Sequence, residues 1–178
     1  MREALGEVWR RVRLTWVDER CVPRRALDSN RGTAHRNGFL REDDPPAVEL
    51  ALFEDGETPE AACERVAEGL GRELHAGLDV VLLGMGADGH VGSIYPDSDA
   101  LKDETGAAVL GVDMPGKRSI TMSLPLINTA ERVVVAASGT KKAETVRAVL
   151  EDDESELPGA CVDAFSTIFF LFRAFSGL

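Results

Sequence analysis

The stretch Leu78-Asp79-Val80-Val81-Leu82-Leu83-Gly84, followed directly by Met85-Gly86-Ala87-Asp88-Gly89-His90, decides the fold of this chain. An almost uninterrupted apolar run that ends in glycine is typical of a parallel β-strand covered on both faces. In open α/β sheets, ligands bind beyond the carboxyl ends of the strands. The stretch therefore predicts both an α/β fold and the loop on which a site would stand.

The residues before this strand predict an α-helix over residues 58–77. Thr58 can cap its N-terminus, and Pro59 suits its first turn. Apolar side chains then recur every four residues as an inward-facing stripe, at Ala62, Val66, Leu70 and Leu74. A helix that leads into a buried strand is half of a β-α-β unit, which indicates a parallel sheet.

Other segments continue this α/β order. Apolar or alternating patterns predict strands over residues 14–17, 120–124 and 132–139, and a helix over residues 140–151. At 178 residues, with 44% hydrophobic content, the chain is long enough for one core and short for two. We expect a single domain over residues 1–178, with an open, mostly parallel, Rossmann-like sheet and helices on both faces.

The composition disfavours several classes of partner. A formal net charge of −11 would repel phosphate backbones and anionic lipid head groups, so neither nucleic acid nor a membrane is expected as a partner. Cys21, Cys63 and Cys161 have no C-x-x-C spacing, and no ligand cluster indicates a metal. The charged N-terminus lacks the apolar core of a signal peptide, which predicts a cytoplasmic protein. The sequence does not indicate an oligomeric state.

The glycines of residues 84–89 also fit G-x-G-x-x-G, the fingerprint of a dinucleotide site. That site requires a helix that begins in the loop and an acidic residue about 20 positions further on, at the end of another strand. Pro96 interrupts any helix there, and no apolar run leads to Asp103 or Glu104. A nicotinamide cofactor is therefore disfavoured, and we expect no cofactor.

The alternative gives roles to Asp88 and His90. A neutral imidazole can take a proton from water, and a nearby carboxylate can hold its tautomer and stabilise the cation that forms. Gly86 and Gly89 would let the backbone turn sharply and approach a substrate closely. The same spacing fits a surface loop in which His90 caps a turn, so the residues alone leave both interpretations open.

Residues 84–96, GMGADGHVGSIYP, resemble the G-x-G-x-D-G-H-x-x-S-[LIF]-[FY]-P signature of 6-phosphogluconolactonases. Further stretches resemble this family in the same order: TWVDERCVP with DSN after it, RSITMSLPLINTAE, SGTKKA and ELPGACV. The resemblance implies hydrolysis of 6-phospho-D-glucono-1,5-lactone to 6-phosphogluconate, in the oxidative pentose phosphate pathway. In that reaction His90 would be the general base that activates water, and a sugar phosphate lactone would be the small-molecule partner.

Glucosamine-6-phosphate deaminases and isomerases are related to this family and are a second possibility. Their similar glycine loop typically continues toward F-N-E-P, whose acid suits ring opening and proton shuttling. The corresponding stretch here, Ser93-Ile94-Tyr95-Pro96, contains no carboxylate. The departure favours hydrolysis over isomerisation.

A phosphorylated substrate needs cations, and the resemblance selects several side chains. Lys142 matches the family's S-G-x-x-K-A and stands in the first turn of a predicted helix, where a bound phosphate would offset the helix dipole. Arg20, after a predicted strand, can grip phosphate or steady an oxyanion. Asp18 can hold Arg20 or a hydroxyl, Asn30 can bind sugar hydroxyls, and Arg118 matches a family arginine. Each also fits a solvated side chain or a surface ion pair.

The resemblance has one gap. The family normally begins with another strand and a G-G-[ST]-T-P-type loop that cradles phosphate, and this sequence contains no such motif. We therefore expect an N-terminally shortened fold without the first β-α unit. Two hypotheses follow: a lactonase, or an inactive or remnant sugar-phosphate-binding protein on the same scaffold.

Overall fold

The computed structural model describes residues 5–74, 77–152, 154–162 and, as backbone, 167–172. The chain divides into two compact units, which are described one at a time. Unit 1 comprises Met1–Ala76 and Val109–Thr121, and unit 2 comprises Gly77–Ala108 and Met122–Leu178. A single domain over residues 1–178 stays a prediction.

Unit 1 begins with a 3-10 helix, η1 (Gly6–Arg11), which leads into strand β1 (Arg13–Thr15). Strand β1 pairs in parallel with β3 (Val48–Leu50). The strand predicted over residues 14–17 is therefore shorter than expected, because the chain leaves this sheet after Thr15 and enters a different one.

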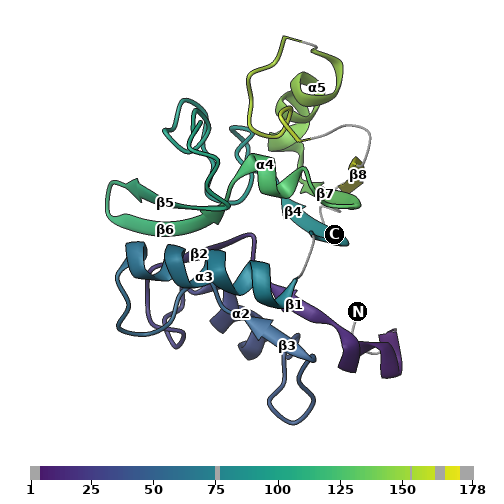
Figure 1. The fold of residues 1–178 in the computed structure, drawn as a ribbon. Coiled ribbons are helices and arrows are strands. Elements are labelled where there is room, and N and C mark those ends of the chain that lie inside the picture. Colours follow the sequence, from purple (N-terminus) through teal and green to yellow (C-terminus); the bar gives the residue numbers. More distant parts are fainter. Residues whose placement is uncertain (1–4, 75–76, 153, 163–166, 173–178) are drawn as a thin grey trace. The chain divides into compact units, whose positions relative to one another are not determined.

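The second sheet of unit 1 has the order β2-β6-β5 (Figure 1). Strand β2 (Asp18–Arg20) pairs antiparallel with β6 (Lys117–Met122), and β5 (Val109–Met114) lies on the other side of β6. The predicted strand over residues 120–124 starts earlier and ends earlier in the structure. It stops at Met122 because Ser123 caps the short helix α4 (Leu124–Ile127).

Helices α2 (Asn30–Arg36) and α3 (Pro59–Glu73) complete unit 1. Helix α3 confirms the helix that the sequence predicts in this region. The hydroxyl of Thr58 accepts a hydrogen bond from the backbone of Ala61 at 3.2 Å, and the predicted stripe is buried as far as Leu70. The helix ends at Glu73, earlier than predicted.

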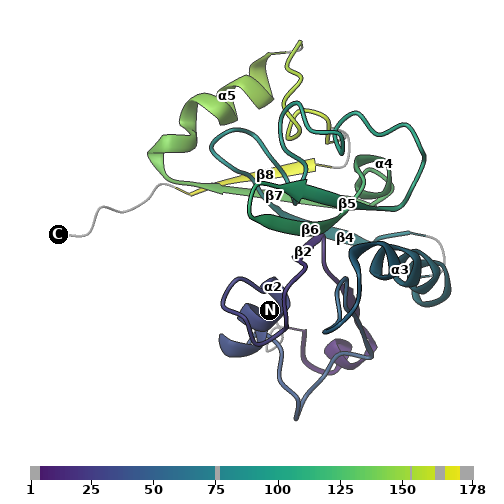
Figure 2. The same ribbon diagram turned by 90° about the vertical axis from the view of Figure 1, so that its left-hand side faces the viewer.

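Unit 2 holds a parallel sheet of order β4-β7-β8, whose strands lie side by side in Figure 2. These strands are β4 (Val80–Gly84), β7 (Arg132–Ser138) and β8 (Thr167–Phe172). After β7 come a 3-10 turn, η2 (Thr140–Lys142), and helix α5 (Ala143–Glu151), which lies to one side of the sheet in both ribbon views. The predicted parallel strands and the α/β class are confirmed.

Strand β4 differs from its prediction in one respect. Val81 and Leu83 are 4% and 3% exposed, but Val80 and Leu82 are 56% and 55% exposed. Successive side chains of a strand point to opposite faces, so one face of β4 is covered and the other is open. The expectation of a strand covered on both faces is therefore wrong for β4.

Among the described residues, no helix is both long and apolar enough to cross a membrane.

Ile120, at the middle of β6, tests the core of unit 1. Its side chain is fully buried, so Ile120→Ala should lower the free energy of unfolding by about 2–5 kcal/mol through lost burial and a cavity. Leu27 is 83% exposed, so the control variant Leu27→Ala should change the free energy of unfolding by less than about 0.5 kcal/mol. Urea denaturation of both variants measures the difference, and equal losses would contradict this placement of Ile120.

Candidate active site

The glycine loop of unit 2 folds into a tight turn directly after β4. Val91 forms isolated β-bridges with Met85 and Ile94, and the backbone N–H of Gly86 donates to the carbonyl oxygen of His90 at 2.8 Å. Residues 85–108 are all described and contain no helix. The helix that a dinucleotide fingerprint requires is therefore missing from this loop.

The loop places His90 against Asp88. The Nδ1 atom of His90 lies 2.5 Å from Oδ1 of Asp88, and the backbone N–H of His90 donates to the same oxygen at 3.2 Å. An ionised carboxylate can only accept hydrogen bonds, so Nδ1 carries the proton and Nε2 is the nitrogen with a free lone pair. The His90 side chain is 32% exposed, which leaves it accessible to water.

The pKa of Asp88 is consistent with this assignment. Burial alone would raise it, but hydrogen bonds from the ring and backbone of His90, with the attraction of that ring, outweigh burial and lower the pKa below its ordinary value. Because the folded-state pKa is depressed, the bond is fully present above the ordinary pKa of an aspartate. It is lost as the pH falls through the lowered value.

Two glycines make the turn possible. An ideal Cβ on Gly86 would overlap both the His90 ring and the Asp88 carboxylate, so only glycine lets these side chains meet there. Gly89 has a φ of +85°, in the left-handed region that side chains other than glycine rarely adopt. Tyr95 was not predicted to act here, yet its ring lies 4.7 Å from the His90 ring, centroid to centroid.

Lys142 and the first turn of α5 donate hydrogen bonds to the glycine loop. The ammonium of Lys142 donates to the carbonyl oxygen of Met85 at 2.5 Å, and the hydroxyl of Thr145 donates to that of Ala87 at 2.5 Å. Lys142 directly precedes α5, whose N-terminus has no side-chain cap. An ammonium has three N–H donors, so two remain for a ligand.

In unit 1, three of the predicted site residues form one cluster. The guanidinium of Arg20 donates from Nη1 to Oδ1 of Asn30 at 2.8 Å and to the carbonyl oxygen of Asp28 at 2.7 Å. The amide of Asn30 donates in turn to the carbonyl oxygen of Asp18 at 3.0 Å and to its carboxylate at 3.3 Å. The cluster fixes one edge of the Arg20 guanidinium.

Glu19 supports this cluster and was missed at the level of sequence. It is 2% exposed, and its carboxylate accepts hydrogen bonds from the backbone N–H groups of Arg20 (2.9 Å), Asn30 (2.7 Å) and Arg31 (2.8 Å) and from the hydroxyl of Ser29 (3.1 Å). The carboxylate thus anchors the N-terminus of α2, where Asn30 begins the helix. Strand alternation, which turns the middle residue of Asp18-Glu19-Arg20 inward, is the pattern that could have identified it.

Arg118 has local acidic partners. Its guanidinium donates to Asp113 at 2.6 Å and to Glu60 at 3.2 Å, and its side chain is 52% exposed. A ligand role for Arg118, and a common site for the predicted residues of the two units, stay predictions. Within the described part of the chain, no group of three or more His, Cys, Asp or Glu side chains is placed to hold a metal ion.

The fold and the loop define an α/β protein with a histidine–aspartate pair on a glycine turn after a parallel strand. The chain belongs to the family of glucosamine-6-phosphate isomerases and 6-phosphogluconolactonases, which it matches over residues 2–169.

Individual relatives agree with this assignment. The chain is 34% identical to the 6-phosphogluconolactonase of Treponema pallidum over 158 residues, which cover 84% of the chain and 64% of that relative. It is 32% identical to 6-phosphogluconolactonase 3, chloroplastic, of Arabidopsis thaliana, with 88% and 52% covered. The crystal structure of 6-phosphogluconolactonase from Thermotoga maritima matches with a TM-score of 0.81 at 25% identity, over 94% of this chain and 75% of that one. The chain thus spans between half and two thirds of the length of these two curated relatives.

Substitution of Gly86 tests the geometry of the pair. Gly86→Ala should separate His90 from Asp88, because the new methyl group occupies their meeting point. The imidazole should then lose the fixed Nδ1–H tautomer, which long-range ¹H–¹⁵N NMR spectra of the ring report. Gly84→Ala is the control, since a Cβ there meets no atom within 4 Å. An unchanged ring spectrum in Gly86→Ala would contradict the described loop.

Substitution of Glu19 tests the anchor of α2. Glu19→Gln places an amide NH₂ against N–H and O–H donors, so the free energy of unfolding should fall by about 1–3 kcal/mol. Glu42, whose side chain is 81% exposed beside Arg24, is the control, and Glu42→Gln should cost less than about 1 kcal/mol. Thermal or urea unfolding measures both variants, and equal effects would refute a buried anchoring role.

Proposed function

We propose that this chain hydrolyses 6-phospho-D-glucono-1,5-lactone to 6-phosphogluconate. The observation that carries the proposal is the His90–Asp88 pair, which leaves Nε2 of a partly exposed imidazole free to accept a proton. Membership of the family supports the same reaction, since several relatives bear the name 6-phosphogluconolactonase.

In the proposed mechanism, Nε2 of His90 takes a proton from a water molecule, and the oxygen of that water attacks the carbonyl carbon of the lactone. Asp88 stabilises the imidazolium that forms, as a carboxylate does in other hydrolases. The tetrahedral intermediate then collapses, the bond between the carbonyl carbon and the ring oxygen breaks, and the imidazolium returns its proton to the departing oxygen. One water is consumed, and the product is the open-chain acid.

The phosphate and the oxyanion require positive or N–H donors. Lys142 and the uncapped N-terminus of α5, which offers backbone N–H groups, are proposed to bind the substrate from unit 2. Arg20, with Asp18 and Asn30 around it, is proposed to bind the substrate from unit 1. A cytoplasmic location and a reaction without a cofactor remain predictions from the sequence.

The alternatives have less support in the loop. Deamination or isomerisation would need a further carboxylate in the stretch after His90, but residues 91–96 contain none and turn back through the bridge between Val91 and Ile94. An inactive sugar-phosphate-binding protein would keep the fold without turnover. The two alternatives give different results in the experiment below.

Lactone hydrolysis tests the proposal, with acid release followed in a pH-stat and corrected for the spontaneous reaction. Removal of the general base in His90→Ala should lower kcat by about 10²- to 10⁴-fold. The control is His35→Gln in unit 1. Nε2 of His35 lies 3.6 Å from Oε2 of Glu49, and this histidine takes part in no step of the proposed mechanism.

Equal rates for the unaltered chain and His90→Ala, neither faster than buffer, would refute the lactonase and favour an inactive binding protein. Release of ammonia from glucosamine 6-phosphate would instead favour the deaminase alternative.

A further inference from the structure

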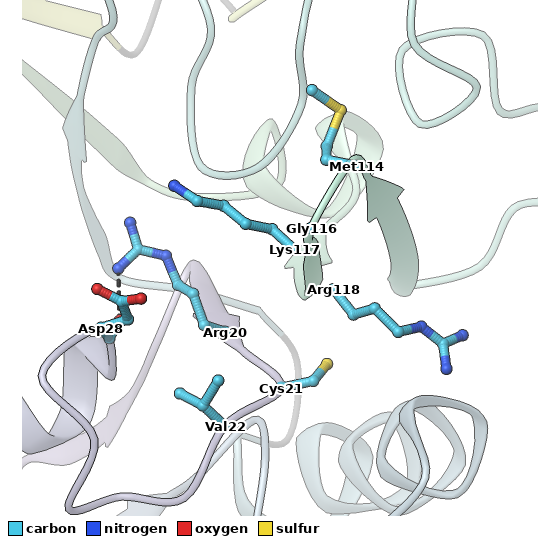
Figure 3. Close-up of a pocket in the computed structure, with 8 residues that line it drawn as sticks. All are labelled: Arg20, Cys21, Val22, Asp28, Met114, Gly116, Lys117 and Arg118. Atoms are coloured by element: carbon cyan, nitrogen blue, oxygen red, sulfur yellow. Dashed lines mark hydrogen bonds between the residues drawn. The ribbon is translucent and has the colours of Figure 1, made fainter.

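A cavity of about 370 Å³ in unit 1 lies between the end of β2 and the turn that joins β5 to β6 (Figure 3). Arg20 and Cys21 line it from the β2 side, and Lys117 and Arg118 line it from β6. Burial raises the pKa of the Cys21 thiol to about 11, so this thiol is neutral near pH 7. The chemistry of the cavity is therefore set by its cations.

The three cations of the cavity differ in their partners. Arg118 is bound to the carboxylates of Asp113 and Glu60, and its side chain extends away from Arg20 in Figure 3. Lys117 extends toward the Arg20 guanidinium and forms no hydrogen bond or ion pair with any described residue. Arg118 is thus neutralised locally, whereas Lys117 is not.

Arg20 also keeps its charge. Its acceptors, the side-chain oxygen of Asn30 and the carbonyl oxygen of Asp28, are uncharged, and both bonds use Nη1. Nε and Nη2 remain as donors on the planar guanidinium. The carboxylate of Asp28 is the acidic group in the lining. The charges of Arg20, Lys117 and Asp28 therefore sum to one positive charge.

We propose that Lys117 acts with Arg20 to bind the phosphate group of the substrate in this cavity, in preference to Arg118. Two cations that face one another repel, and a phosphate between them turns this repulsion into two charge-assisted hydrogen bonds. The inference rests on the proposed function for the identity of the ligand, and it assigns a ligand residue that the sequence pattern did not select.

Calorimetric titration with 6-phosphogluconate tests the inference without turnover. Lys117→Met should weaken binding roughly five- to thirtyfold, as expected for one charge-assisted hydrogen bond, and Lys117→Arg should restore most of it. Lys141→Met, which removes the same charge from an exposed position in unit 2, is the control and should bind as the unaltered chain does. Arg118→Met should have a smaller effect than Lys117→Met.

Three results would overturn the inference: unchanged binding in Lys117→Met, a larger effect from Arg118→Met, or equal weakening for gluconate, which has no phosphate. With the lactone, Lys117→Met should raise KM by a similar factor and leave kcat within about twofold, because a ground-state contact is lost. Hydrolysis that depends on His90 but not on Lys117 would refute this inference alone. Binding of 6-phosphogluconate that depends on Lys117, without any hydrolysis, would refute the proposed function alone.

Discussion

The hydrogen bond between Asp88 and Nδ1 of His90 is the interaction on which the candidate active site depends. It is possible because Gly86 has no side chain at the point where the two groups meet, and because Gly89 adopts a left-handed turn. The ionised carboxylate accepts only, so the bond fixes the tautomer and directs the basic nitrogen outward. All these residues lie within one short loop, so the chemistry of the pair is set by local backbone geometry.

The loop in turn is held by a segment more than fifty positions away in the sequence. Lys142 and Thr145, at the start of α5, donate to carbonyl oxygens of the loop. A cation at a helix N-terminus is unfavourable with respect to the helix dipole, and the Met85 carbonyl compensates only in part because it is uncharged. This residual conflict favours an anion beside Lys142.

The sequence predicted the elements that local rules determine. The cap at Thr58 and the four-residue stripe placed α3, and the apolar runs placed β4 and β7. The break between β1 and β2 and the open face of β4 depend on which strands pair and which side chains are covered, and no local pattern states either. Glu19 was missed although strand alternation turns it inward. A glutamate normally indicates a surface, and its burial is possible only because backbone donors up to twelve positions away converge on it.

The surroundings of the arginines suggest how an acidic chain keeps a binding cation available. Most arginines with close partners in unit 1 are neutralised by carboxylates, among them Arg31 with Glu49 (2.7 Å), Arg65 with Glu57 (2.5 Å) and Arg118 with Asp113 (2.6 Å). Arg20 is oriented equally well, but by an amide oxygen and a carbonyl oxygen. Neutral acceptors fix a guanidinium without cancelling its charge, whereas a carboxylate does both. In a chain with a net charge of −11, the uncharged acceptors of Arg20 thus orient its guanidinium without offsetting its charge.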